Sequence, residues 1–295
     1  MDYPPPDRYV QVGDIKTRYW AVGESGSALI LIHGILRFAE DWTHNLEALA
    51  QTHRVYAIDL IGYGCTDKPD IEYRLDDFVA FVRGFMDAVG IERATLIGHS
   101  LGGGVAINVA HRYPERVERL VLVAGAGFGQ KVHLFFRLAS LPVLPRLWAH
   151  PTRLIMRQAF RQVVYDGDLI TDDMVDLAYE RFYLPGARAA LLKTIRNGVT
   201  LPGIRREILT LVQEALPSIT MPTLIIWGRQ DPVLPVAHAD IAIERLPNAR
   251  LHLLDECGHF PMFEHPHIFN ALVNEFLVES GTIAPPSFLL AQVAD

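Results

Sequence analysis

Ser100 lies at the centre of Gly98–Gly102, a GHSLG pentapeptide that separates an apolar run from a helical pattern. A serine at a sharp strand-to-helix turn takes a strained backbone conformation, so the positions two before and two after it must be small. Gly98 and Gly102 meet this requirement. Such a turn lifts the hydroxyl above a sheet edge and directs helix amides toward developing negative charge. The pentapeptide therefore predicts a serine nucleophile.

A serine hydroxyl is a weak nucleophile at neutral pH, so it needs a base, and the base needs an acid that fixes its tautomer. Two loops that follow apolar runs contain these residue types. Asp231 follows the run at 225–227, and His259 follows the run at 253–254. We therefore predict a catalytic triad of Ser100, Asp231 and His259.

Each of these residues has a structural alternative. Ser100 can serve only as the N-cap of the following helix. Asp231 can serve only to start the turn at the proline that follows it. His259 can be a buried histidine with a structural role alone. Asp255 is a rival acid, but it lies only four residues before His259, so we expect it to brace that loop.

Two further patterns are not assigned to chemistry. His265 and His267 have a spacing that metal sites use, but Pro266 between them favours the start of a helix. Gly102–Gly104 is not followed by a lysine in the register of a phosphate-binding loop. We predict no metal and no cofactor.

The elements that must position these side chains alternate along the chain. Two strands joined at 13–14 are followed by apolar runs at 28–32, 55–60, 94–97, 120–123, 223–227 and 251–254, with helical patterns between most of them. This alternation predicts an α/β fold with a parallel sheet and helices on both faces. Between 125 and 218 the pattern becomes helical, rich in proline and aromatic residues, including Phe128, Phe135, Phe136, Trp148 and Phe160. We predict a core of residues 1–125 and 218–295 and an inserted helical cap of residues 126–217.

With these motifs, residues 8–278 resemble the α/β-hydrolase superfamily, in its serine-nucleophile, esterase- and lipase-like branch with a helical cap. The motifs are His33–Gly34, Asp59–Gly64, Gly98–Gly103, Gly228–Pro232 and Gly258–His259. The chain order of serine, aspartate and histidine is also the order in that family. The resemblance implies the α/β-hydrolase fold, with a mostly parallel eight-stranded sheet.

The resemblance also implies roles for other positions. The backbone amides of Ile35 and Leu101 would hold the oxyanion, and the cap would shape the substrate pocket. Asp59, a second rival acid, would support loop structure. His33 is expected to anchor the oxyanion loop by hydrogen bonding, and His99 to pack beside the strand.

A serine with a histidine base supports acyl transfer through a tetrahedral oxyanion and an acyl-enzyme. Because the cap is aromatic and Met262 and Phe263 follow the base, we predict hydrolysis of small to medium lipophilic carboxylic esters through Ser100. One alternative is a carbon–carbon bond hydrolase resembling those that cleave ring-fission dienoic acids. The chain departs from that family at His99, where the family has Asn, and at Ile35–Phe38, where it has a glycine-rich loop. Another alternative is a ligand-binding receptor on the same fold.

Composition limits the partners. The formal net charge is −7 and the sequence pI is near 5.9, which argues against a nucleic-acid partner. The N-terminal residues lack the pattern of a signal peptide, and no segment predicts a membrane span. Cys65 and Cys257 do not form a disulfide framework. We therefore predict a cytoplasmic protein with a small lipophilic ester as substrate and leave the oligomeric state open.

Overall fold

The computed structural model describes residues 4–142 and 151–279. Trp148 of the predicted cap and the C-terminal tail from residue 280 lie outside these residues. One eight-stranded sheet forms the centre of the molecule, in the order β1-β2-β4-β3-β5-β6-β9-β10. Its strands are β1 Arg8–Val12, β2 Ile15–Val22, β3 Ala28–Ile32, β4 Arg54–Ile58, β5 Ala94–His99, β6 Val117–Val123, β9 Thr223–Gly228 and β10 Ala249–Leu254. Only the pairings of β2 with β1 and β4 are antiparallel, so the predicted mostly parallel sheet is confirmed.

The central strands are buried on both faces, which explains their continuous apolar sequences. Successive side chains point to opposite faces. In β3, Ile30 packs into one apolar core and Leu31 into the other, and in β5 Leu96 and Ile97 divide in the same way. The two cores fix the positions of the carboxyl ends of neighbouring strands relative to one another.

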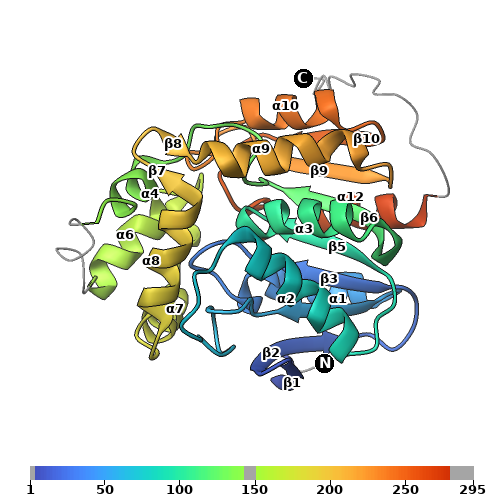
Figure 1. The fold of residues 1–295 in the computed structure, drawn as a ribbon, viewed down its shortest axis with the longest axis horizontal. Helices are drawn as coiled ribbons and strands as arrows, with labels where there is room; N and C mark the ends of the chain where they lie inside the picture. The colour runs from blue at the N-terminus through green and yellow to red at the C-terminus, as the bar shows by residue number, and fades with distance from the viewer. Residues whose placement is uncertain (1–3, 143–150, 280–295) are drawn as a thin grey trace.

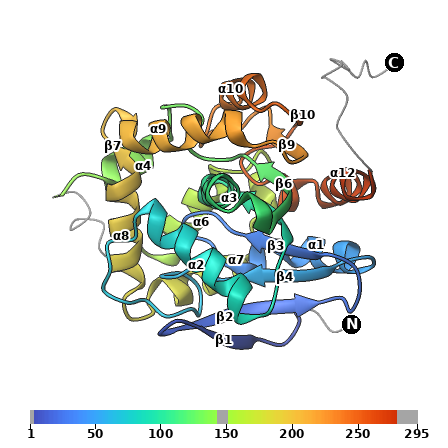
Figure 2. The same ribbon diagram turned by 45° about the vertical axis from the view of Figure 1, so that its right-hand side comes forward.

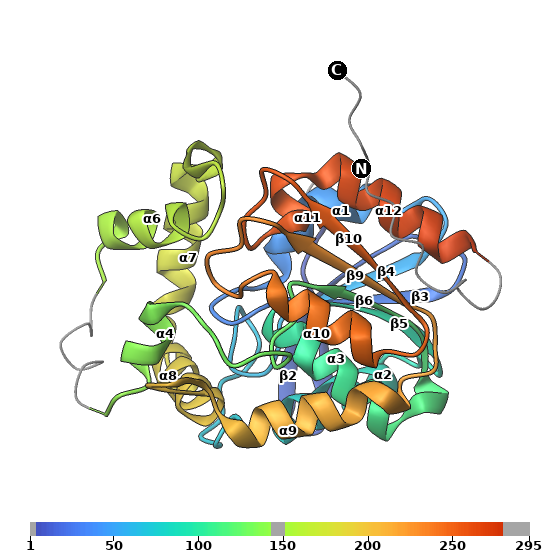
Figure 3. The same ribbon diagram turned by 90° about the horizontal axis from the view of Figure 1, so that it is seen from above.

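Helices cover both faces of this sheet (Figure 3). On one side lie α1 Thr43–Ala50, α11 Pro261–Glu264 and α12 Pro266–Val278, which contact one another. On the other side lie α2 Leu75–Ala88, α3 Leu101–Arg112, α9 Arg206–Ala215 and α10 Ala237–Arg245, and α3 packs between α2 and α9. The predicted helix start after His265 is confirmed, because α12 begins at Pro266.

A separate group of helices follows β6 and stands to one side of the sheet (Figures 1 and 2). Its members are α4 Leu134–Ala139, α6 Arg153–Arg161, α7 Asp172–Phe182 and α8 Ala187–Gly198. The short strands β7 Val199–Thr200 and β8 Gly203–Ile204 then pair with each other before α9 returns to the layer of α3. The predicted boundaries of the cap, 126 and 217, remain a prediction. Within the described residues, no helix combines the length and the apolar character that crossing a membrane requires.

Candidate active site

Ser100 occupies the turn between β5 and α3 with φ of 52° and ψ of −115°. A positive φ is costly for a residue with a side chain, so the surroundings must hold it. The amide of Ser100 donates to the carbonyl of Val123 at 2.9 Å, and its carbonyl accepts from the amides of Ala126 at 2.9 Å and Gly103 at 3.0 Å. Hydrogen bonds to β6 and the loop after it therefore fix the turn.

Two glycines make the turn possible. A Cβ atom on Gly98 would lie 2.3 Å from the carbonyl oxygen of Gly102, and one on Gly102 would lie 2.3 Å from that of Ile32. Close backbone contacts therefore leave no room for a side chain at either position, and glycine is required at both. Ser100 stands at the N-cap position of α3, yet its side chain makes no capping hydrogen bond. Its hydroxyl is therefore not committed to the helix.

Asp231 and His259 meet at the ends of β9 and β10. The Nδ1 atom of His259 lies 2.8 Å from Oδ2 of Asp231, and both residues are buried. The other oxygen, Oδ1, accepts from the amides of Val233 at 2.8 Å and Leu234 at 2.9 Å. One carboxylate thus both forms the turn and holds the imidazole, so the two interpretations of Asp231 are compatible. A proton on Nδ1 leaves Nε2 as the basic nitrogen.

Ser100 and His259 line the same pocket, although their side chains make no direct hydrogen bond to each other in this structure. The pocket has a volume of about 120 Å³. Its lining residues are Ile35, Leu36, Arg37, His99, Ser100, His133, Phe135, Phe136, Ala159, Phe160, Gln162, Val163, Val233, His259 and Phe260. Most are apolar or aromatic, and they come from the core and from the segment that follows β6.

His99 has a contact that the sequence did not indicate. Its Nε2 atom lies 2.8 Å from the carbonyl oxygen of His259, so it must donate, and the two rings are 4.8 Å apart. Its Nδ1 atom is buried without a hydrogen-bond partner among the described residues. Burial, with His259 nearby, lowers the pKa of His99 well below its ordinary range, which keeps the ring neutral. His99 therefore supports the backbone of the candidate base.

The loop after β3 lies against the nucleophile. A Cβ atom on Gly34 would lie 3.1 Å from Cβ of Ser100. His33 holds this loop, because its Nε2 accepts from the amide of Leu60 at 2.9 Å and its Nδ1 lies 2.7 Å from the carbonyl of Gly34. Burial lowers the pKa of His33 to about 4. The anchoring role expected of His33 is consistent with these bonds.

Two backbone amides are expected to hold the oxyanion. That of Leu101 follows Ser100 in the sequence, and that of Ile35 belongs to the loop that lies against Ser100. Leu101 is the first residue of α3, and Ile35 follows Gly34 and lines the pocket. Among the described residues, neither amide has a hydrogen-bond acceptor. Their assignment to an oxyanion hole remains a prediction.

The rival acids serve other contacts. Asp59 is buried and accepts from the amides of Ala39 and Cys65, each at 2.8 Å, which is the loop-supporting role expected of it. Asp255 is exposed and pairs with Arg229 at 2.6 Å. Neither contacts His259. In residues 4–142 and 151–279, no three His, Cys, Asp or Glu side chains are grouped as metal ligands would be.

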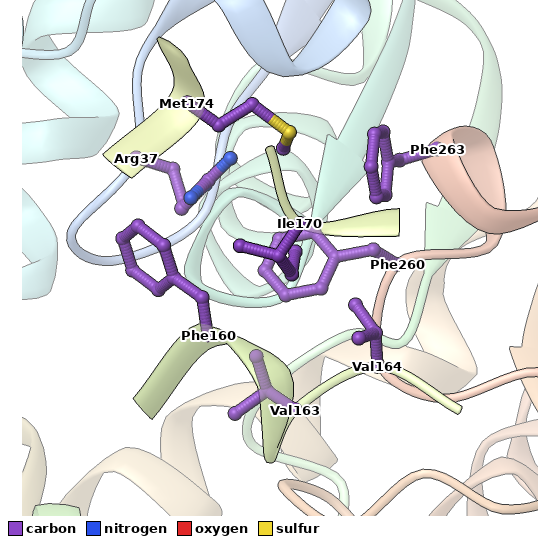
Figure 4. Close-up of a pocket in the computed structure, with 8 residues that line it drawn as sticks. All are labelled: Arg37, Phe160, Val163, Val164, Ile170, Met174, Phe260 and Phe263. Carbon is purple, nitrogen blue, oxygen red and sulfur yellow. The ribbon is translucent and has the colours of Figure 1, made fainter. Parts of the chain in front are cut away.

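Arg37 lines both the main pocket and a smaller apolar pocket, which Figure 4 shows. The smaller pocket has a volume of only about 10 Å³ and shares Arg37, Phe160, Val163 and Phe260 with the first. The sequence placed Arg37 only in a loop that departs from a glycine-rich pattern. Its position depends on packing against the cap, for which the sequence carried no signal.

Comparison with known proteins connects this site to a family. The model of the alpha/beta hydrolase family matches residues 29–272. The chain is 31% identical to the 2-hydroxymuconate semialdehyde hydrolase of Pseudomonas sp. strain CF600, over 95% of this chain and 97% of that protein. It is 30% identical to the 2-hydroxy-6-oxo-2,4-heptadienoate hydrolase of Pseudomonas putida F1, over 92% and 95% of the two chains. The crystal structure of the meta-cleavage product hydrolase CumD of Pseudomonas fluorescens IP01 is 33% identical, with a TM-score of 0.79 over 92% of this chain and 97% of that one.

These relatives correct the function predicted from the sequence. They are named for the hydrolysis of a semialdehyde, a heptadienoate and a meta-cleavage product, not of esters. The prediction of a carboxylesterase or lipase acting on lipophilic esters is therefore wrong, whereas the assignment to hydrolases holds. The error has a physical cause, because a serine, a histidine and an aspartate activate a nucleophile without specifying which bond next to the carbonyl breaks. From the family match and the full-length similarity, the chain belongs to the alpha/beta hydrolase family.

Proposed function

We propose that this protein hydrolyses a carbon–carbon bond in 2-hydroxy-6-oxo-dienoic acids, the products of ring fission. The observation that carries the proposal is the similarity to the two dienoate hydrolases and to CumD over more than nine-tenths of this chain. The arrangement of Ser100 and His259 in one pocket, with Asp231 behind the imidazole, supports it. The substrate is thus a small acid that carries a ketone or aldehyde at carbon 6.

The proposed reaction begins with a proton shift. The enol proton at the C2 oxygen moves to C5, which gives a C2 ketone conjugated with the C3–C4 double bond. This step is needed because a carbanion at C5 is a poor leaving group unless its charge can spread to an electronegative atom. Once C2 is a ketone, the electron pair released at C5 extends to the C2 oxygen as a dienolate.

Bond cleavage then uses the triad. His259 Nε2 takes the hydroxyl proton of Ser100 as Oγ attacks C6, which requires these atoms to come within hydrogen-bond reach. The C5–C6 bond breaks and its electron pair leaves with the dienolate, which takes the proton released by His259 at its C2 oxygen. Water, deprotonated by His259, then releases the acyl group from Ser100. The balance is one water consumed and two carboxylic acids released.

The backbone amides of Ile35 and Leu101 are proposed to stabilise the oxyanion at C6. Asp231 is proposed to keep His259 in the Nδ1–H tautomer and to stabilise the imidazolium. The cap segment contributes Phe135, Phe136 and Phe160 to the pocket wall, and we propose that these side chains exclude water from the reactive dienolate.

The proposal is tested with 2-hydroxy-6-oxo-2,4-heptadienoate, whose yellow dienolate loses its visible absorption on cleavage. We expect wild-type protein to bleach the solution and Ser100→Ala protein to leave it coloured. If both proteins bleach at the same rate, the nucleophile is misassigned. If Ser100 is labelled by a fluorophosphonate but neither this compound nor its 6-phenyl analogue is cleaved, the protein is a receptor on a hydrolase fold.

A further inference from the structure

Arg37 is the one residue with a permanent charge among the described residues that line the main pocket. It lies between the cap and the core. Its guanidinium carbon is 5.2 Å from the ring centroid of Phe160 in the α6 region and 5.1 Å from that of Phe260, the residue after His259. Figure 4 shows its nitrogen atoms turned toward Ile170 and Met174 in the smaller pocket. Because Arg37 also lines the main pocket, the cation lies at the boundary of the two pockets and between two aromatic rings.

Asp41 fixes the orientation of this cation. The Nε atom of Arg37 lies 2.7 Å from Oδ1 and 3.0 Å from Oδ2 of Asp41, and Nη2 of Arg37 also pairs with Oδ1. The Arg37 side chain is 13% exposed and that of Asp41 is 1% exposed. The remaining terminal nitrogen, Nη1, makes no hydrogen bond to any described residue. One edge of the planar guanidinium is held, and the other edge can still donate.

We infer that Arg37 binds the substrate carboxylate and thereby selects anionic dienoic acids. The inference rests on the proposed function, because the dienoate substrates carry a carboxylate at carbon 1 as well as the keto group at carbon 6. A carboxylate that enters an apolar pocket loses its hydration and needs a charge-assisted partner. Arg37 supplies donors in a planar fork that suits a carboxylate.

The position of Arg37 in the loop fits this role. Ile35, two residues earlier, is the proposed oxyanion amide, and Gly34 lies against Ser100. One loop thus presents a donor for the oxygen at carbon 6 and a cation for the carboxylate at carbon 1. The rings of Phe160 and Phe260 lie close to the guanidinium carbon and limit its hydration, which strengthens its interaction with an anion.

The test measures binding without catalysis. Calorimetric titrations compare 2,4-hexadienoate with 2,4-hexadienamide, which has the same shape but no charge. We expect wild-type protein to bind the carboxylate at least about tenfold more tightly than the amide. In Arg37→Gln the preference should disappear, and in Arg37→Lys, which retains a charge but not the fork, it should be reduced.

Two further variants separate binding from folding. Arg37→Gln leaves Asp41 buried without its partner, which is destabilising, so the double variant Arg37→Gln/Asp41→Asn removes both charges together. Its preference for the carboxylate should also be lost. Arg161→Gln removes an arginine from the exposed pair with Asp168, which has a 2.7 Å contact, and should bind both ligands as wild type does.

The inference is overturned if wild-type protein binds the two ligands equally, or if the double variant retains the preference. These results are separate from a failure of the proposed function. A wild-type protein that prefers the carboxylate through Arg37 but does not bleach the heptadienoate would keep this anion site and lose the assigned reaction.

Discussion

The sheet and helix α6 of the cap differ in how firmly their residues are held. Every residue of β9 is buried, and the turns at its end are fixed by hydrogen bonds to Asp231. In α6, by contrast, Met156 is the only buried residue among those described, and Leu154 is 74% exposed. Exposed ion pairs, such as Arg161 with Asp168, join the cap segments. Such pairs add little stability.

Catalytic and pocket-shaping side chains stand on differently packed elements. The side chains proposed for catalysis stand at the ends of strands that two apolar cores hold in place, so their geometry tolerates little change. The cap side chains Phe135, Phe136 and Phe160 reach the pocket from α4 and α6, and each of these helices buries one residue. We therefore expect core changes to affect turnover and stability strongly, and surface changes in the cap to affect them weakly.

The largest effect is expected for Ser100→Ala in the core. Turnover of the heptadienoate should fall by at least about a thousandfold, because no other group in the pocket replaces the nucleophile. The melting temperature should stay within a few degrees of wild type, since the hydroxyl makes no capping bond. A loss of turnover that accompanies unfolding would show only that the turn needs serine.

Asp231→Asn should lower kcat by about a hundredfold or more, because an amide cannot hold the imidazolium in the same way. The asparagine oxygen can still accept from Val233 and Leu234, so the turn should persist. Asp255→Asn, at the exposed rival acid, is the matched control and should retain full activity. Equal losses in the two variants would refute the assignment of Asp231.

A pair of leucine substitutions measures the contrast in stability. Leu224 in β9 is fully buried, and Leu224→Ala should lower the free energy of unfolding by about 2–5 kcal/mol. Leu154→Ala in α6 should change it by less than about 0.5 kcal/mol. Urea unfolding followed by circular dichroism gives both values. Comparable losses would mean that Leu154 of α6 is held as firmly as Leu224 of the sheet.

Acid should weaken the core through its buried histidines. Burial lowers the pKa of His33 to about 4, from an ordinary value of 6.5. Between these values the unfolded chain binds a proton that the folded chain does not. The contribution of His33 to the free energy of unfolding is therefore fully present above pH 6.5. It should be lost as the pH drops toward 4, which lowers the free energy of unfolding by up to about 3 kcal/mol. In urea titrations at several pH values, His33→Asn should flatten this slope, and an unchanged slope would contradict the role of His33.

The smallest effect is expected for His99→Asn. Asparagine is too short to keep the 2.8 Å contact with the carbonyl of His259, so the base should be held less firmly. We expect kcat to fall by about tenfold with KM unchanged. A change confined to KM would indicate that His99 contacts substrate instead of positioning His259.

Much of the core could be predicted from the sequence because its signals are local. A fully apolar run such as β3 indicates a strand buried on both faces, and the glycines beside Ser100 report a turn whose backbone contacts exclude a side chain. The order of Ser100, Asp231 and His259 then placed all three at one edge of the sheet.

The remaining features depend on contacts between distant segments. His99 meets a residue 160 positions away, and Arg37 lies against Phe160 of the cap. No local pattern encodes either contact. The bond that is cleaved could not be predicted for a related reason, since the triad activates the nucleophile alike for either class of substrate and the pocket sets the rest.

Product analysis of the heptadienoate reaction in H₂¹⁸O identifies the bond that this protein cleaves. We predict one acetate for each dienoate consumed, with ¹⁸O from water in its carboxyl group, and 2-hydroxypenta-2,4-dienoate as the other product. Loss of the yellow colour without acetate, or acetate free of the isotope, would contradict hydrolysis of the C5–C6 bond.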